Sequence, residues 1–219
     1  MRKPIPPGDP SSAAPPNEDR AYFEHCGDHP FKYDSGEFEL VNAWWMAEAA
    51  LLAYADEDFV EACFGEAGLP EVRYFHGEST QCYAAHNDDF VLVAFSGTDM
   101  RERAGNNAFD ALADWMVNLS FDTVPSGAEG LDLPVYRFVN GGDAVPKLPV
   151  RGPYLHAGVE KYIDDEGRIQ DGKPGGGGVR AKGGRLVRRL HPSRPSGGAL
   201  RDHSPILYAV HIWNAYVRE

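Results

Sequence analysis

Residues 90–95 read Phe90-Val91-Leu92-Val93-Ala94-Phe95, an uninterrupted apolar run that ends in the tight turn Ser96-Gly97-Thr98-Asp99. Apolar side chains on both faces of a strand are typical of the centre of an α/β sheet, because helices cover both sides of such a sheet. Upstream, residues 81–85 and the turn at 86–89 predict the first half of a hairpin. The run therefore predicts an α/β protein in which this strand is buried on both faces.

Helical spacing of apolar residues flanks this region. Residues 40–54 have it, with Asn42 as the predicted N-cap, and a second helix is predicted to begin after its cap Asp56. The remaining elements follow from the same two periodicities. They are helices over 109–119 and 204–217 and strands over 72–75, 135–140 and 154–163.

The length of 219 residues and the apolar fraction of 42% allow a real core. Residues 1–20 are rich in Pro, Ser, Asn and Asp and predict a disordered tail. Residues 21–219 then form one α/β domain. Within it, residues 168–200 hold several glycine pairs and arginines, which predicts a flexible loop that cannot pack a core.

The formal net charge of −12 argues against a nucleic-acid binder. The charge is uneven, because residues 168–201 contain nine Lys or Arg and one acid, a local balance of 9 − 1 = +8. Two interpretations of this basic segment stay open. It docks on the acidic body or stays solvated, or it makes transient contact with an anionic membrane surface.

The three cysteines, Cys26, Cys63 and Cys82, have no metal-ligand spacing and no disulfide pattern. No phosphate-binding glycine loop and no His or Cys cluster indicates a cofactor or a metal. Basic residues near the N-terminus precede no apolar stretch, so no secretory signal is predicted. No apolar run approaches the roughly 20 residues of a membrane span. These features predict reduced thiols and a cytoplasmic location.

Three residues carry candidate chemistry, and each also has a simpler explanation. Asp143 ends the string Asn140-Gly141-Gly142-Asp143, which is also typical of a type I or I′ turn. His203 precedes the last predicted helix, where it is also explained as a first-turn residue beside a capping Asp202. Thr98 follows Gly97, and this pair is also explained as an ordinary turn without a role in catalysis.

The order of the pieces is more informative than any one of them. A long strand ends in a Gly-Thr turn, a Trp-bearing helix follows, a further strand ends in Asp, and a His precedes the final helix. The most specific string is Asn-x-x-Asp-x-Val-Pro-x-Leu-Pro. The segments that carry this order span about 38–214, with the glycine-rich segment as a gap. They are Asn42-Ala43-Trp44-Trp45, Ala47-Glu48-Ala49, Val91-Leu92-Val93-Ala94-Phe95-Ser96-Gly97-Thr98, Asp114-Trp115-Met116-Val117-Asn118-Leu119, Tyr136-Arg137-Phe138-Val139-Asn140-Gly141-Gly142-Asp143-Ala144-Val145-Pro146-Lys147-Leu148-Pro149 and Asp202-His203.

In this order the chain resembles the class 3 (fungal-type) triacylglycerol lipase family of α/β-hydrolases. The resemblance implies that Thr98 supplies an oxyanion-hole donor, that Asp143 orients the catalytic histidine, and that His203 is the general base. It implies a lid over about 99–114, a lipid ester or fatty acid as ligand, and no metal in the chemistry. Residues 21–219 would then form a lipase-like domain, an α/β-hydrolase-derived sheet with helices on its faces.

The family's nucleophile is absent from this pattern, because no Gly-x-Ser-x-Gly occurs in the chain. The nucleophile elbow places a serine on a sharp strand-to-helix turn, and it should lie between the Trp helix and the Asp strand. Here the loop that ends at Gly130 runs almost directly, through Leu131, into the strand predicted over 135–140, and it leaves no room for the elbow. The central strands of the sheet are therefore expected to be missing, which leaves exposed strand edges. Other serines in this half of the chain lack the glycine setting, namely Ser96, Ser120 and Ser126.

Three hypotheses on function follow. The first is a lipase-like carboxylic-ester hydrolase that is inactive as written, because a triad without its nucleophile cannot form an acyl-enzyme. The second is a non-catalytic lipid-binding remnant that keeps an apolar groove. The third is a truncated gene model of an active lipase, in which the missing segment belongs between Gly130 and Leu131.

Overall fold

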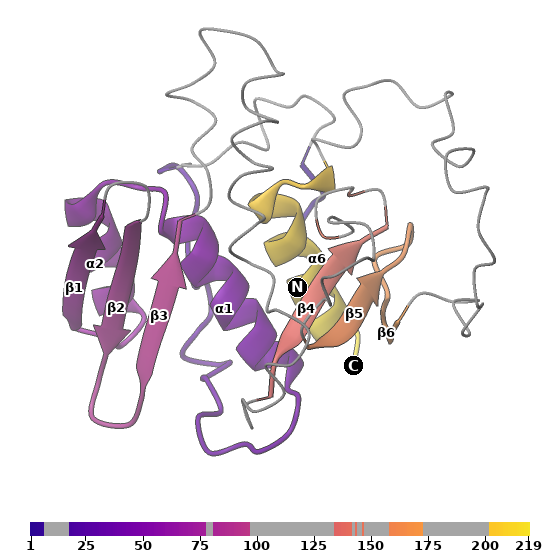
Figure 1. Cartoon of the computed structure of the whole chain (residues 1–219), viewed down its shortest axis with the longest axis horizontal. Helices are drawn as coiled ribbons and strands as arrows, with labels where there is room; N and C mark the ends of the chain where they lie inside the picture. The colour runs from indigo at the N-terminus through magenta and orange to yellow at the C-terminus, as the bar shows by residue number, and fades with distance from the viewer. Residues whose placement is uncertain are drawn as a thin grey trace, which may run out of the picture.

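The computed structural model describes residues 1–6, 18–77, 81–96, 134–141, 143, 146, 158–172 and 202–219. In these ranges three helices and two three-stranded sheets make a mixed α/β arrangement. The helices are α1 (Leu40–Leu52), α2 (Glu57–Glu66) and α6 (Pro205–Tyr216). The strands are β1 (Glu71–His76), β2 (Gln81–His86), β3 (Val91–Phe95), β4 (Tyr136–Asn140), β5 (Val159–Ile163) and β6 (Ile169–Asp171). Figure 1 shows α1 running obliquely between the two sheets.

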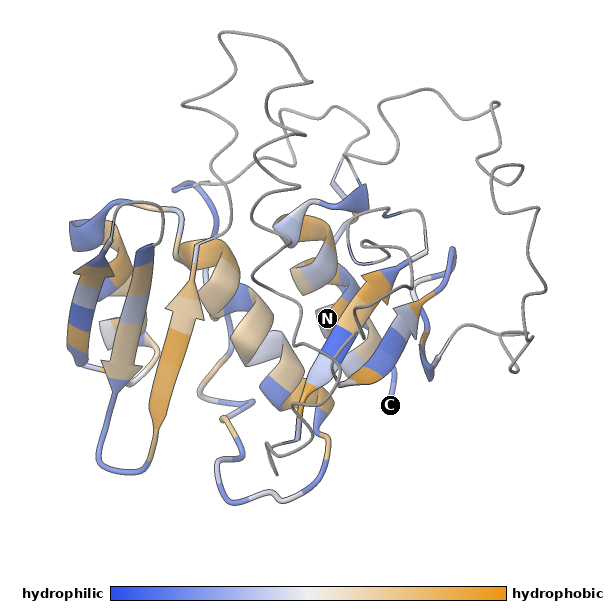
Figure 2. Ribbon diagram, in the orientation of Figure 1, coloured by the Kyte–Doolittle hydropathy of each residue, from blue (hydrophilic) through white to orange (hydrophobic). Residues whose placement is uncertain are grey.

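The first sheet has the order β1-β2-β3, with both pairs antiparallel, so the predicted hairpin of β2 and β3 is confirmed. The predicted burial of β3 on both faces is wrong. Leu92 and Ala94 are buried, whereas Val91 and Phe95 on the other face are 66% and 59% exposed. An antiparallel sheet that packs a single face on the core buries only alternate residues, even where all of them are apolar. Figure 2 shows this apolar strand beside α1.

The second sheet has the order β4-β5-β6, in which β4 and β5 are parallel and β5 and β6 antiparallel. Gly158 permits the close start of the parallel pair. Its φ is +81°, and a Cβ at this position would lie 2.6 Å from the carbonyl oxygen of Val135. The next amide, that of Val159, donates to the same oxygen at 2.8 Å.

The strand β6 falls within the segment predicted to be a flexible loop from residue 168. Lys161, Tyr162 and Ile163 of β5 pair with its three residues, so the loop prediction is wrong for 169–171. The sequence did not indicate this pairing, because the glycine-rich composition of the whole segment predicts a loop and a strand of three residues does not change that composition. The rest of that loop from residue 173, the predicted helix over 109–119 and the lid-like segment 99–114 lie outside the described residues.

The helices α1 and α2 begin where the sequence predicts, but the predicted capping residues are only partly confirmed. Asp56 occupies the N-cap position of α2, as predicted, but its side chain makes no capping hydrogen bond. The N-cap of α1 is Glu39, and Asn42 lies inside the first turn. The prediction of Asn42 as a cap is wrong because its amide pairs with a neighbouring segment. It accepts from the N–H of Lys32 at 2.8 Å and donates to the carbonyl of Lys32 at 2.9 Å.

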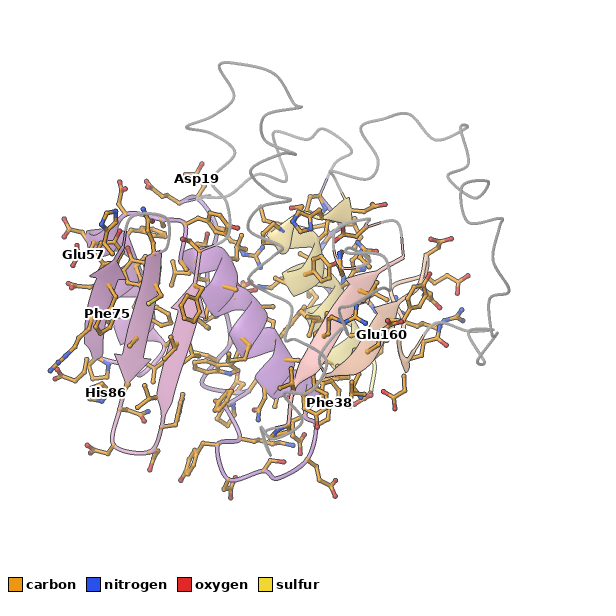
Figure 3. The ribbon with its side chains drawn as sticks, viewed as in Figure 1. Asp19, Phe38, Glu57, Phe75, His86 and Glu160 are labelled. Atoms are coloured by element: carbon orange, nitrogen blue, oxygen red, sulfur yellow. The ribbon has the colours of Figure 1, made fainter. Side chains whose placement is uncertain are left out.

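The core lies where α1 and α6 pack together and meet the inner face of the first sheet. Trp44 of α1 and Trp213 of α6 are fully buried, with ring centroids 4.7 Å apart. Burial of each large side chain contributes about 1.5–3 kcal/mol. The aromatic packing extends to the second sheet through Phe38, whose ring centroid lies 4.8 Å from that of Tyr136 (Figure 3). Fully buried aliphatic and aromatic partners include Leu51, Leu52, Phe64 and Ile212.

The N-terminal residues lie against α6, whereas a disordered tail was expected over residues 1–20. The indole N–H of Trp213 donates to the carbonyl of Met1 at 2.8 Å. The side chain of Asn214 both accepts from the N–H of Lys3 and donates to its carbonyl, each at 2.8 Å. These side chains satisfy the backbone of a segment that has little to bury, so the expectation does not hold for residues 1–3. Residues 7–17 lie outside the described ranges.

Candidate active site

Asp143 and His203, which lie 60 residues apart in the chain, are in contact. Nδ1 of His203 is 3.0 Å from Oδ2 of Asp143. Asp143 follows the end of β4 and His203 lies just before α6. The Asp143 side chain is fully buried, and that of His203 is 44% exposed. The two residues that the sequence predicts as orienting acid and base therefore form a pair with a buried carboxylate and an accessible imidazole.

A tight turn after β4 places the carboxylate. The N–H of Asp143 donates to the carbonyl of Asn140 at 3.0 Å, so the turn interpretation of this string and its place in the site are both compatible with the structure. The N–H of Gly141 donates to the carbonyl of Ile163 in β5 at 2.9 Å. A Cβ at Gly141 would lie 2.8 Å from the hydroxyl of Tyr162, so glycine permits this close approach.

The imidazole is placed by the start of α6. Ser204 is the N-cap and Pro205 follows it, so Asp202 does not have the capping position considered for it. The carbonyl of Asp202 instead accepts a hydrogen bond from the side-chain amide of Asn140 at 3.0 Å. Proline suits the first helical turn because that position needs no backbone N–H. The residue before His203 is thereby tied to the end of β4.

The contact sets the tautomer of His203. An ionised carboxylate can only accept hydrogen bonds, so the imidazole nitrogen that faces Asp143 carries the proton. Neutral His203 then has its lone pair on Nε2, away from the carboxylate. An imidazole held in this way can accept a proton at Nε2, and the carboxylate stabilises the resulting imidazolium. The arrangement can thus perform general-base chemistry.

Tyr208 is a third member of this cluster and was not predicted from the sequence. Its hydroxyl donates to Oδ2 of Asp143 at 2.6 Å and accepts from the N–H of Asn140 at 3.1 Å. Burial, reinforced by the negative charge of Asp143, raises the pKa of Tyr208 far above its ordinary value, so the phenol stays a neutral donor. The available signal was a tyrosine one turn into a mostly apolar helix.

Of the other residues considered for the site, Ser96 lies within the described ranges. Thr98, the predicted oxyanion donor, lies outside the described residues, as do Ser120 and Ser126. Ser96 is described, and its hydroxyl donates to the carbonyl of Gln81 at 3.3 Å, at the paired end of β2 and β3. Among the three predicted site residues, the structure therefore brings Asp143 and His203 together.

Metal-binding clusters and membrane-spanning helices are both absent from the described part of the chain. Within it, no group of three or more His, Cys, Asp or Glu side chains comes together in a way that could hold a metal ion. None of its helices combines the length and the apolar character that crossing a membrane requires. Cys26, Cys63 and Cys82 are free, partly buried thiols.

No family model, no curated protein and no solved structure matches this chain. Its helices and sheets define the class as α/β.

Proposed function

We propose that this chain carries the acid–base half of a lipase-type carboxylic-ester hydrolase site, which acts in its family on triacylglycerols or related lipid esters. The observation that supports the proposal is the 3.0 Å contact between His203 Nδ1 and Asp143 Oδ2. The family resemblance requires that these two distant positions come into contact, whereas the hydrophobic periodicity of the chain does not predict the contact. The buried carboxylate and exposed imidazole match the two assigned roles.

In a complete site of this type, His203 takes the proton of an attacking hydroxyl and returns it to the leaving alkoxide. Asp143 keeps Nδ1 protonated and stabilises the imidazolium. Thr98 is proposed to donate to the oxygen that becomes negative in the tetrahedral intermediate. The chain contains no Gly-x-Ser-x-Gly, so no acyl-enzyme forms and only a slower attack by water is left. We therefore expect negligible esterase activity.

The arrangement of the sheets supports an α/β-hydrolase ancestry with central strands missing. In the described part of the chain, β3 ends one sheet and β4 ends the other. Figure 1 shows these two strands on opposite sides of α1. The break in the resemblance, between Gly130 and Leu131, falls in the chain between the same two strands.

Two assays test the proposal. Purified protein should hydrolyse p-nitrophenyl butyrate no faster than the variant His203→Ala. Turnover that this variant abolishes would contradict the expected inactivity. A chimera that carries a lipase strand–Gly-x-Ser-x-Gly–helix–strand segment between Gly130 and Leu131 should gain turnover, and His203→Ala should remove that gain. A folded chimera without turnover would contradict the proposed ancestry.

A second candidate function, non-catalytic lipid binding, is favoured by the outer face of the first sheet. There Phe75 and Phe95 are more than half exposed and lie opposite each other across Cys82 (Figure 3 labels Phe75). Displacement of a fluorescent fatty acid would measure such binding. Loss of binding in Phe95→Ser, but not in Glu57→Gln on α2, would support this function.

Sequencing of the transcript tests the gene-model alternative, because it reveals any missing serine segment.

A further inference from the structure

Two hydrogen-bond donors converge on one carboxylate oxygen at the candidate site. Oδ2 of Asp143 accepts from the hydroxyl of Tyr208 at 2.6 Å and lies 3.0 Å from Nδ1 of His203. The same phenol oxygen accepts from the N–H of Asn140 at 3.1 Å. Tyr208 thus links the last residue of β4 with the carboxylate three residues later, and it uses one donor and one acceptor to do so.

The chain connectivity gives this link a mechanical consequence. Tyr208 belongs to α6, and His203 lies immediately before that helix. The phenol therefore ties the helix that carries the imidazole to the turn that carries the carboxylate. A shift of α6 relative to β4 would change the separation of Asp143 and His203, and the short bond from Tyr208 opposes that shift. Charge-assisted bonds of this kind are about twice as strong as neutral ones.

We propose that Tyr208 is a positioning residue, which holds the Asp143 carboxylate in place and thereby keeps neutral His203 in the Nδ1–H tautomer. The use of that tautomer in ester hydrolysis rests on the proposed function, whereas the positioning does not require turnover. Tyr208 is not a catalytic residue in this scheme, because it acts through the Asp143 oxygen.

Nitrogen-15 NMR of the full chain, labelled at histidine, tests the proposal. At about pH 9 histidine is ordinarily neutral, and the nitrogen shifts of His203 should report the Nδ1–H tautomer. In Tyr208→Phe the ring still packs but the hydroxyl is lost, so we expect a mixture of the two tautomers and faster exchange of the Nδ1 proton. Tyr216→Phe is a matched control, because Tyr216 lies on the same helix as Tyr208 and its hydroxyl is 3.0 Å from Nδ1 of another histidine, His29. It should leave His203 unchanged.

A pure Nδ1–H tautomer in Tyr208→Phe, with wild-type proton exchange, would overturn the proposal. If that variant does not fold, 3,5-difluorotyrosine at position 208 keeps both the ring and the hydroxyl and changes the donor strength. It should move the nitrogen shifts of His203, and unchanged shifts would also overturn the proposal. Failure of the proposed function is distinguishable, because the chimera would then lack turnover while the tautomer of His203 still responded to Tyr208.

Discussion

Asp143 and Glu48 are both fully buried carboxylates, but their partners give them different roles. Asp143 meets two side chains at the candidate site, one of them an accessible imidazole. Glu48 lies in α1 and forms ion pairs with two basic side chains. Its Oε1 is 2.5 Å from Nη2 of Arg20 and 3.9 Å from Nζ of Lys3. The indole N–H of Trp44 donates to the same oxygen at 3.2 Å. We assign Glu48 a structural role, since its partners are cations and an indole donor.

We expect Glu48→Gln to lower the free energy of unfolding by about 3 kcal/mol, because removal of one partner of a buried ion pair leaves the other charge uncompensated. Urea unfolding followed by tryptophan fluorescence measures this change. Glu39→Gln is the control, since Glu39 pairs with the exposed Lys32 at 2.8 Å. Exposed pairs contribute little, so its unfolding midpoint should hardly move. Equal losses in the two variants would contradict the structural role of Glu48.

Among the elements, the turn between β5 and β6 is organised by one side chain. Oδ1 of Asp164 accepts from the N–H groups of Glu166 and Arg168, each at 2.9 Å. Its Oδ2 accepts from Nε of Arg168 at 2.8 Å. Partial burial opposes ionisation of this carboxyl, but these hydrogen bonds and the Arg168 charge outweigh it and lower the pKa of Asp164. The turn brings β6 back beside β5.

The lowered pKa of Asp164 predicts the direction of a pH effect. A carboxyl whose pKa is lower in the folded chain contributes stability above its unfolded value, about 3.9, and loses that contribution as the pH falls through the folded value. The melting temperature of Asp164→Asn should therefore be lower than that of the wild type near pH 7, and the difference should shrink below about pH 4. Thermal melts between about pH 2.5 and 7 measure it.

Asp165→Asn is the matched control for this turn, because Asp165 is the exposed neighbour. It should give a smaller difference at neutral pH. A gap between wild type and Asp164→Asn that stays constant down to about pH 2.5 would contradict the assigned hydrogen bonds.

For the whole molecule, the two ends of the chain stabilise each other. Met1 and Lys3 bind Trp213 and Asn214 near the end of α6, and Lys3 also lies near Glu48 of α1. Figure 1 shows the N-terminus beside α6. The first residues thus brace the pair of helices whose packing forms the core, and the same α6 carries Tyr208.

Deletion of residues 1–6 should lower the free energy of unfolding by about 3 kcal/mol, because it removes three hydrogen bonds of about 1 kcal/mol each. Chemical denaturation measures the loss, and hydrogen exchange should show faster opening of α6. Lys3→Met keeps the backbone bonds to Asn214 and removes only the charge, so it should lose less. An unchanged unfolding midpoint in the deleted chain would show that the segment does not brace α6.

Much of the secondary structure could be predicted because it follows from local spacing. The hairpin of β2 and β3, the start of α2 after Asp56 and the final helix lie where periodicity and turn residues indicate them. The errors arose where a distant segment changes the outcome. Asn42 pairs with Lys32 in place of the helix backbone. Residues 1–3 bind a helix more than 200 residues later, and no local pattern indicates that.

At the candidate site, the sequence by itself indicated the residue types and the order of Asp143 and His203. Only the tertiary structure brings them to 3.0 Å, adds Tyr208, and shows that β3 has an exposed face. The physical reason is that a run of apolar residues records which side chains favour burial, whereas burial itself depends on which surface packs against them. Likewise, a hydrogen bond between residues 60 apart depends on the packing of α6 against the rest of the fold, which no local pattern encodes.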